Sequence, residues 1–249
     1  MSRRDKPPAS AFTGLLVLDK PIGLSSMEAA SACRTKAGGR KAGIKVGHAG
    51  TLDPLADGVL VLAFGAATKH IDRIMALPKR YRTTFDLSAF TSSGDLEQDV
   101  QPVEVAQVPT CHDVSDAIEK FVGEISQRPP AFSALQIDGK RAYIHARAGI
   151  ITELEPRTVT IHRIDVLRYD WPQVELDIRC GKGMYVRSLA RDLGEALATG
   201  GHVTRLRRTA VGPFTDAMAV KLDDVPRPLL LNYLMPLESG LRLIEASID

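Results

Sequence analysis

Residues 45–60 place one carboxylate in a glycine-rich loop just before an apolar run; they read Lys-Val-Gly-His-Ala-Gly-Thr-Leu-Asp-Pro-Leu-Ala-Asp-Gly-Val-Leu. The flanking glycines permit backbone conformations closed to other residues, and Pro54 fixes φ directly after Asp53. A loop carboxylate held against a strand often has a function, as a nucleophile or as a base. The plainer interpretation of Leu-Asp-Pro by itself is a turn in which Asp53 caps a backbone amide. Asp53 is therefore the first candidate for chemistry.

Basic residues gather in two further segments. Between Arg34 and Lys45 there are five basic residues and no acidic one, and a second group lies between His202 and Arg208. Two such groups can line one groove along an RNA backbone, whereas a single charge cluster is more often a solvated surface. The candidates for contacts with RNA phosphates are Arg40, Lys41, Lys45, Arg205, Arg207 and Arg208.

The composition excludes several classes of protein. Of 249 residues, 44% are hydrophobic and 25% charged, as in ordinary globular proteins, and the formal net charge is +2. No apolar stretch reaches the roughly 18 residues of a membrane span. The three cysteines and six histidines show none of the spacings of a disulfide framework or zinc site, so we expect no metal. Residues 1–12 lack the apolar core of a signal peptide, which predicts a disordered leader and a cytoplasmic protein.

The elements around the candidate loop can be predicted from periodicity and capping signals. Residues 15–18 form a buried strand, and a capping box that begins at Ser25 starts a helix ending near Lys36. We expect residues 39–57 to be one long loop, of the kind that is often functional. Residues 59–64 are β-branched and apolar and predict the next strand.

Strands and helices alternate irregularly in the rest of the chain. Apolar and polar residues alternate over residues 79–90, which predicts a half-exposed strand that carries Tyr81. We also expect helices over residues 66–77, 113–122 and 184–198, a strand, a turn and a helix between Arg128 and Gly149, and paired strands over residues 157–169 and 174–180. Because regular βαβ alternation is missing, the fold class is α+β with a mixed sheet.

Several separated motifs resemble those of the TruB family of tRNA pseudouridine synthases. The loop around Asp53 is similar to the family pattern G-H-T-G-T-L-D-P-x-A-x-G-V-L, and residues 18–26 resemble its L-D-K-P-x-G-x-[ST]-S segment. Further segments similar to the family motifs lie at residues 79–81, 129–143, 181–194 and 202–209. The resemblance extends from Gly14 to about Phe214, which is most of the chain.

This resemblance implies a fold, an activity and roles for individual residues. The fold would be that of pseudouridine synthases, a mixed, largely antiparallel sheet with a catalytic cleft and flanking helices. The activity would be isomerisation of the uridine at position 55, in the TΨC loop of tRNA. By the resemblance Asp53 is the nucleophile, Tyr81 stacks on the target uracil and relays a proton, and Arg187 pairs with Asp53. The residues that would bind the flipped nucleotide are His48, Tyr185, Leu206 and Lys20.

These roles suit the reaction physically. Isomerisation breaks an N-glycosidic bond and joins C5 of the same base to C1′, so the enzyme must hold a detached uracil, and the reaction needs no cofactor. Attack by the carboxylate and proton abstraction by it are both compatible with the residues. An arginine favours the ionised carboxylate, and aromatic stacking worth roughly 1–3 kcal/mol per base offsets the cost of flipping. The plainer interpretations are core residues for Tyr81 and Leu206, a turn cap for His48 and a surface ion pair for Arg187.

The chain also departs from the family pattern. Ala49 stands where the family usually has threonine, and Asp57 adds a second carboxylate, which would raise the pKa of Asp53 if it pointed inward. Residues 91–98 keep only part of the pattern T-D-T-x-D-x-x-G, so we expect target choice or affinity to differ. We expect a catalytic domain over residues 13–215 and a C-terminal segment, residues 216–249, that is too short for a full PUA-type domain.

Three alternatives remain open. The first is a pseudouridine synthase for another structured RNA, the second an RNA-binding or RNA-folding protein with a relic site, and the third an unrelated aspartyl enzyme acting on a small nucleoside. Intact Asp53, Tyr81 and Arg187 argue against the relic, and the basic clusters argue against the nucleoside enzyme. The expected partner is the T-arm stem-loop of tRNA, without a membrane and without an obligate protein partner.

Overall fold

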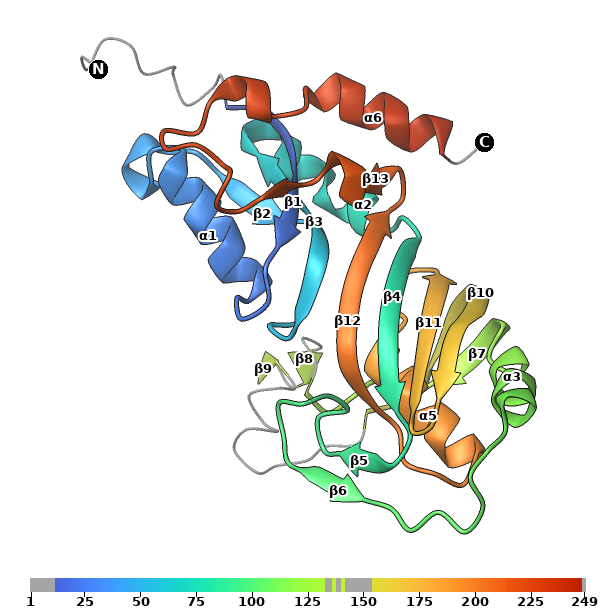
Figure 1. Ribbon diagram of the computed structural model, residues 1–249. Helices are drawn as coiled ribbons and strands as arrows, with labels where there is room; N and C mark the ends of the chain where they lie inside the picture. The colour runs from blue at the N-terminus through green and yellow to red at the C-terminus, as the bar shows by residue number, and fades with distance from the viewer. Residues whose placement is uncertain (1–11, 133–135, 138–139, 142–153, 248–249) are drawn as a thin grey trace. The chain divides into compact units, whose positions relative to one another are not determined.

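The structure, a computed structural model, describes residues 12–132, 136–137, 140–141 and 154–247 (Figure 1). The chain divides into two compact units, one of Met1–Lys79 with Arg207–Asp249 and one of Arg80–Leu206. Strand β12 (His202–Val211) has residues in both units. The helix expected before Gly149 lies outside the described residues, and the division at residues 12 and 215 stays a prediction.

Two long apolar strands form the centre of the first unit. Strand β1 (Gly14–Lys20) pairs antiparallel with β3 (Ala56–Phe64), with Leu18 opposite Leu60. The strand order in this unit is β14-β1-β3-β12, and β2 (Val46–His48) also pairs with β3. Strand β14 (Val220–Lys221) is parallel to β1, whereas β13 (Phe214–Thr215) is antiparallel to β12.

Alternate residues of these strands enter two different cores. Leu16 and Leu18 pack with helix α1 (Ser26–Lys36) on one face of the sheet, and Val17 packs with α2 (Ile71–Met75) and α6 (Leu237–Ala246) on the other. Figure 1 shows α1 beside β1 and β2. Because both faces are covered, β1 and β3 read as continuous apolar runs rather than as alternating ones. The strands predicted over residues 15–18 and 59–64 are therefore confirmed.

Helix α1 begins and ends as its sequence predicts. The Ser25 side chain accepts a hydrogen bond from the backbone N of Glu28, and the Glu28 carboxylate accepts one from the backbone N of Ser25. This reciprocal pair satisfies backbone donors that the first turn leaves open. The last helical residue is Lys36, and Gly38 and Gly39, both with positive φ, follow the helix.

Two predictions for the first unit were wrong. Residues 39–57 are not one loop, because a 3₁₀ turn (Arg40–Ala42), strand β2 and the start of β3 lie within them. A strand as short as β2 has no periodicity to detect and forms through its pairing with β3. The helix expected over residues 66–77 is a 3₁₀ helix (Gly65–His70) that continues into the short α2.

The second unit contains the strand order β12-β4-β11-β10-β7. The predicted pairing is confirmed, because β10 (Arg157–Asp170) runs antiparallel to β11 (Gln173–Cys180) and to β7 (Gly123–Gln127). Strand β4 (Lys79–Asp86) alternates as expected, with Thr83 and Phe85 buried and Arg80 and Arg82 exposed. The small strand pairs are β5 (Ala89–Thr91) with β6 (Val100–Pro102) and β8 (Gln136–Ile137) with β9 (Lys140–Arg141).

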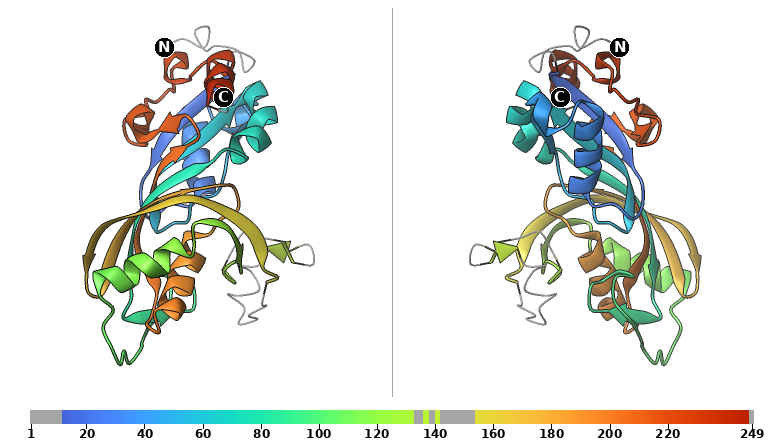
Figure 2. Two further views of the ribbon diagram at one scale, coloured as in Figure 1. Left: turned by 90° about the vertical axis from the view of Figure 1, so that its right-hand side faces the viewer. Right: turned by 90° about the vertical axis from the view of Figure 1, so that its left-hand side faces the viewer.

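Within the described part of this unit, two helices cover one face of these strands. Helix α3 (Cys111–Glu119) contacts β10 and helix α5 (Val186–Ala196), and Figure 2 shows both helices on the same side of the sheet. The predicted helices over residues 113–122 and 184–198 are thus confirmed with shifted ends.

Two further 3₁₀ turns are Asp216–Met218 and Leu231–Tyr233. No helix within the described part of the chain is long and apolar enough to cross a membrane.

Candidate active site

Asp53 is half-buried in the turn between β2 and β3, and the backbone around it is held by hydrogen bonds. The hydroxyl of Ser26 accepts a bond from Leu52 N at 2.7 Å and donates one to Leu52 O at 2.9 Å. The backbone N of Gly23 donates to Pro54 O at 2.8 Å. The backbone on both sides of Asp53 is therefore held in place, which limits the positions that its carboxylate can reach.

Lys20 lies in the electrostatic field of this loop. Its side chain is 0% exposed, and Nζ donates to Pro21 O at 2.9 Å and to Leu24 O at 2.6 Å. Burial lowers the pKa of Lys20 to about 8, and attraction to the carboxylates of Asp57 and Asp53 opposes this shift. Because Lys20 has no exposed surface, we propose that it acts on the site through its charge; direct contact with substrate stays a prediction.

Asp57, the second carboxylate near Asp53 in the sequence, forms an ion pair with an arginine. Arg207 Nη1 lies 2.8 Å from Asp57 Oδ2, and the same guanidinium makes two bonds to Asp19, at 3.0 and 3.1 Å. Hydrogen bonds from Arg207 and its charge therefore compensate both acids locally. The expected influence of Asp57 on Asp53 stays a prediction.

Arg208 does not have the exposed position that its place among the basic residues suggested. It is 1% exposed, and its guanidinium donates to backbone carbonyls of the Asp53 loop. The cause is the alternation of β12, which buries Leu206 and Arg208 and exposes Arg205. We therefore correct the proposed phosphate contact for Arg208. Arg207 is only 24% exposed and already paired with carboxylates, which makes it a poorer candidate as well.

In the second unit Arg187 is buried on the first turn of α5. Nη1 donates to Ser93 O at 2.9 Å, Nη2 donates to Phe132 O at 2.8 Å, and Nε lies 3.7 Å from Asp95 Oδ2. Its side chain is 6% exposed, so the surface ion pair considered from the sequence is excluded. The predicted pairing of Arg187 with Asp53 involves residues of both units and stays a prediction.

Asp95 is a functional candidate that the sequence reasoning missed. Its Oδ1 accepts hydrogen bonds from Ser93 Oγ at 2.6 Å and from Glu97 N at 3.0 Å, and its backbone O accepts one from Thr91 Oγ1 at 2.7 Å. Thr91 and Asp95 are the positions at which residues 91–98 still match the family pattern. That match was the signal in the sequence that could have pointed to Asp95. The segment keeps only part of the family pattern, but it holds the buried Arg187.

The remaining predicted residues are placed as follows. Tyr185 precedes α5, and its backbone N and O bond to the buried side chain of Gln127 at 2.8 and 3.2 Å. Tyr81 on β4 and His48 on β2 are half-buried. Leu206 is 8% exposed, which also agrees with a role in the core. Asp53, His48 and Lys20 thus belong to the first unit, and Tyr81, Tyr185, Arg187 and Leu206 to the second.

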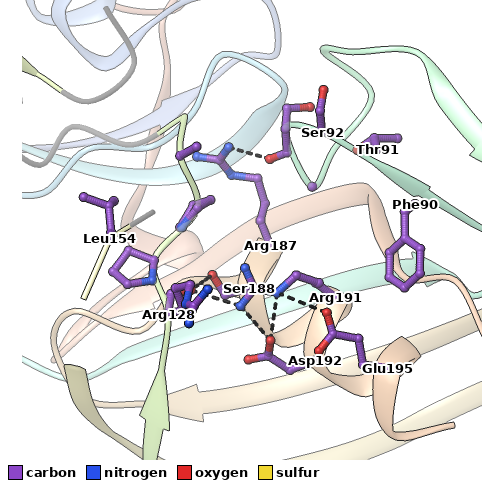
Figure 3. A pocket seen from close by; sticks show the side chains of 15 residues that line it. Phe90, Thr91, Ser92, Arg128, Leu154, Arg187, Ser188, Arg191, Asp192 and Glu195 are labelled. Atoms are coloured by element: carbon purple, nitrogen blue, oxygen red, sulfur yellow. Dashed lines mark hydrogen bonds and ion pairs between the residues drawn. The ribbon is translucent and has the colours of Figure 1, made fainter. Parts of the chain in front are cut away.

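A pocket of about 630 Å³ in the second unit brings Arg187 together with the segment from Thr91 to Gly94. Figure 3 shows Arg187 extending toward the Ser92 side, whereas Arg191 and Asp192 lie on the other side of the pocket. Arg191 Nη2 donates to Asp192 Oδ1 at 2.6 Å. Burial nevertheless raises the pKa of Asp192, and the bond from Arg191 only partly opposes the shift.

Another pocket, of about 590 Å³, lies in the first unit and is rimmed by basic residues. Arg34, Arg40 and Lys45 line it, together with the apolar side chains of Ile44 and Ile71. Arg40 and Lys45 are exposed, as is Lys41 in the same segment. The structure therefore brings two of the predicted phosphate contacts, and Arg34 with them, to one hollow. Among the described residues, no cluster of histidine, cysteine, aspartate and glutamate could hold a metal ion.

Comparison with known proteins covers nearly the whole chain. Residues 36–186 match the model of the TruB family pseudouridylate synthase N-terminal domain, and residues 187–242 match that of the tRNA pseudouridylate synthase B C-terminal domain. The chain is 46% identical over 225 residues to tRNA pseudouridine synthase B of Burkholderia mallei (strain ATCC 23344), an alignment that covers 90% of this chain and 70% of that protein. For the same-named protein of Pseudomonas paraeruginosa (strain DSM 24068 / PA7) the identity is 42%, with 93% and 77% covered.

Solved structures show the same fold. A chain of a Cbf5-Nop10-Gar1 complex superposes with a TM-score of 0.71 at 27% identity, covering 96% of this chain and 65% of that one. A chain of an H/ACA RNP bound to a substrate RNA containing 2′-deoxyuridine gives a TM-score of 0.68 at 25% identity, with 94% and 62% covered. The chain thus spans somewhat less than two thirds of these two solved chains.

Proposed function

Since the chain belongs to the TruB family of pseudouridylate synthases, we propose that it isomerises uridine to pseudouridine in tRNA, at position 55 of the TΨC loop. The observation that carries the proposal is the position of Asp53, half-buried in a loop that matches the family motif and is held at Leu52 and Pro54. A carboxylate in a restrained loop can meet the same atom of a flipped nucleotide at every turnover. A tRNA substrate supports the cytoplasmic location that we propose for this enzyme.

Asp53 is the proposed reactive group. The N1–C1′ bond breaks, the uracil turns while it is held, C5 bonds to C1′, and the proton on C5 is lost while N1 gains one. Asp53 starts this sequence either by covalent attack or by removing a proton from the sugar, and both routes need its ionised form. No atom is gained or lost overall, so the reaction needs neither an oxidant nor a second substrate.

Two residues of the second unit are proposed to act with Asp53. Tyr81 would stack on the uracil, which offsets part of the cost of removing the base from the helix. Arg187 would stabilise the charge of the carboxylate, and its own orientation is already set by Ser93, Asp95 and Phe132. His48, Tyr185 and Leu206 would surround the extruded nucleotide.

The RNA backbone is proposed to cross the basic pocket of the first unit. Arg34, Arg40 and Lys45 line this pocket, and Lys41 extends the same exposed surface. Their charges would neutralise phosphates and release counterions, which gives affinity without reading sequence. The exposed Arg205 is a further candidate in the second unit. The recognised partner would then be the T-arm stem-loop, read by its shape and by the flipped uridine.

Release of tritium from tRNA transcript labelled at C5 of uridine tests the proposal, with the modified position mapped afterwards. We expect release from wild-type protein at one uridine in the T loop, and none from Asp53→Asn. Release only from another structured RNA would move the activity to a different target. RNA binding without any release would reject an enzyme and favour an RNA-binding protein with a relic site.

A further inference from the structure

We propose that Arg208 is a positioning residue that holds the backbone of the loop on both sides of Asp53. The inference goes beyond the assignment of Asp53 itself, but its link to catalysis rests on the proposed function. Arg208 would act through the main chain of the loop and would not contact RNA.

The side chain of Arg208 reaches the loop at three points. Nη2 donates to Gly50 O at 3.2 Å and Nη1 donates to Thr51 O at 3.2 Å, both before Asp53 in the chain. Nε donates to Val59 O at 2.8 Å, after it. One guanidinium thus joins the beginning of the loop to the strand at its end.

Arginine is suited to this position because its planar fork carries several donors in a fixed arrangement. A buried backbone carbonyl that is not paired within the sheet needs another hydrogen-bond donor. A buried positive charge in turn needs hydrogen-bond acceptors. Arg208 is 1% exposed, so water can hardly replace the carbonyls that accept from its guanidinium. A lysine would keep the charge but would direct its donors from a single nitrogen atom.

The main chain of Arg208 also contacts the end of the loop. Gly58 has a φ of +102°, and a Cβ added there would lie 2.3 Å from Arg208 O. Only glycine permits this approach between the loop and β12. Together with Ser26, which holds Leu52, Arg208 therefore fixes the loop from a different element of the first unit.

The test uses full-length Arg208→Met and Arg208→Lys with Lys36→Met as the matched control. Lys36 is also a cation that holds backbone carbonyls in the first unit, since its Nζ donates to Leu222 O at 3.0 Å and to Val225 O at 2.6 Å, outside the loop. Three quantities are measured for each variant: hydrogen–deuterium exchange of residues 49–59, affinity for tRNA, and the single-turnover rate at saturating tRNA. Thermal unfolding shows the temperature at which all variants are folded.

For Arg208→Met we expect exchange in the loop to become at least about tenfold faster, while the dissociation constant for tRNA changes by less than about threefold. The single-turnover rate should fall about a hundredfold, as a displacement near 1 Å in a catalytic group does. The single-turnover rate of Arg208→Lys should also remain well below that of wild type. Lysine keeps the charge, but without the planar guanidinium it does not restore the hydrogen bonds to the loop. Lys36→Met should keep both wild-type exchange in the loop and the wild-type rate.

Two results would overturn the inference. One is a wild-type exchange pattern and rate in folded Arg208→Met. The other is weaker tRNA binding with an unchanged rate at saturation, which would make Arg208 a phosphate contact after all. If Arg208→Met does not fold, Arg208→Lys carries the same comparison. If wild-type protein does not turn over tRNA, the proposed function fails, while loop exchange still decides whether Arg208 holds the loop.

Discussion

Arg187 and Asp95 form an ion pair within the second unit, with Arg187 Nε 3.7 Å from Asp95 Oδ2 and side chains only 6% and 8% exposed. Burying two charges carries a large desolvation cost, which their attraction offsets only when further hydrogen bonds satisfy both groups. Here Ser93 contributes to both partners, since its backbone O accepts from Arg187 and its Oγ donates to Asp95. Residues 91–98, together with Phe132, therefore set the orientation of the arginine proposed to act on Asp53.

Asp95→Asn should lower both stability and activity. The substitution keeps the shape of the side chain but leaves Arg187 without its buried counter-charge, so we expect the free energy of unfolding to fall by about 1–3 kcal/mol. The single-turnover rate should fall at least about tenfold, because Arg187 loses one of the three contacts that set its orientation. Denaturant unfolding and tritium release at saturating tRNA measure the two effects.

Asp165→Asn is the control for that substitution. Asp165 pairs with Arg163 at 2.7 Å in the same unit, but both side chains are solvent-exposed. Its loss should leave activity and stability close to wild type. Equal effects of the two substitutions would mean that burial of the Arg187–Asp95 pair has no particular importance.

Asp53→Asn should abolish isomerisation and leave binding nearly intact. The amide is almost the same size as the carboxylate but is neither a nucleophile nor a base. We expect the dissociation constant for tRNA to change by less than about tenfold, which is roughly 1.4 kcal/mol. Filter binding and tritium release on the same preparation measure both quantities, and substantial turnover by the purified variant would end the assignment of Asp53.

Arg40→Ala and Lys45→Ala should weaken tRNA binding and reduce its dependence on salt. Both side chains line the basic pocket. The slope of log affinity against log salt concentration should therefore decrease by about one for each phosphate contact that a substitution removes. The rate at saturating tRNA should not change. Arg242→Ala removes an equal charge from an arginine whose side chain is 80% exposed on α6, and it should leave the slope unaltered. An unchanged slope in the pocket variants would exclude this path for the backbone.

Lys20 should make stability depend on pH in the alkaline range. Burial lowers its pKa in the folded protein to about 8 from an ordinary value of 10.5. Between these values the unfolded chain binds more protons than the folded one, so the contribution of Lys20 to the free energy of unfolding rises as pH increases. Unfolding of wild type and of Lys20→Met should be compared at intervals from neutral pH to pH 10.5. Parallel curves for the two proteins would contradict the lowered pKa.

The three cysteines should differ in reactivity. Cys33 and Cys180 are buried, whereas Cys111 is exposed, and burial also raises the pKa of Cys33 to about 11. Because the thiolate is the reactive form, a brief treatment of the folded protein with a maleimide should modify Cys111 alone. Peptide mapping by mass spectrometry identifies the labelled residue, and comparable labelling of Cys33 would indicate that α1 opens readily.

The sequence by itself determined the features that depend on near neighbours in the chain. The capping box of Ser25 and Glu28 closes within one turn of helix, and the apolar runs of β1 and β3 are recognisable because every residue must be buried on one face or the other. The family motifs likewise identified Asp53, Tyr81 and Arg187 as candidates, since their spacing is a property of the chain alone.

Only the tertiary structure decided what distant residues do to one another. Strand β2 exists because it pairs with β3, and Arg208 is buried because β12 lies beside β3 and its alternation turns that side chain inward. In the same way, Asp95 meets Arg187 from a segment more than 90 residues earlier in the chain. A linear pattern records the type of each residue, but the burial and partners that determine its role depend on contacts between segments, which form when the chain folds.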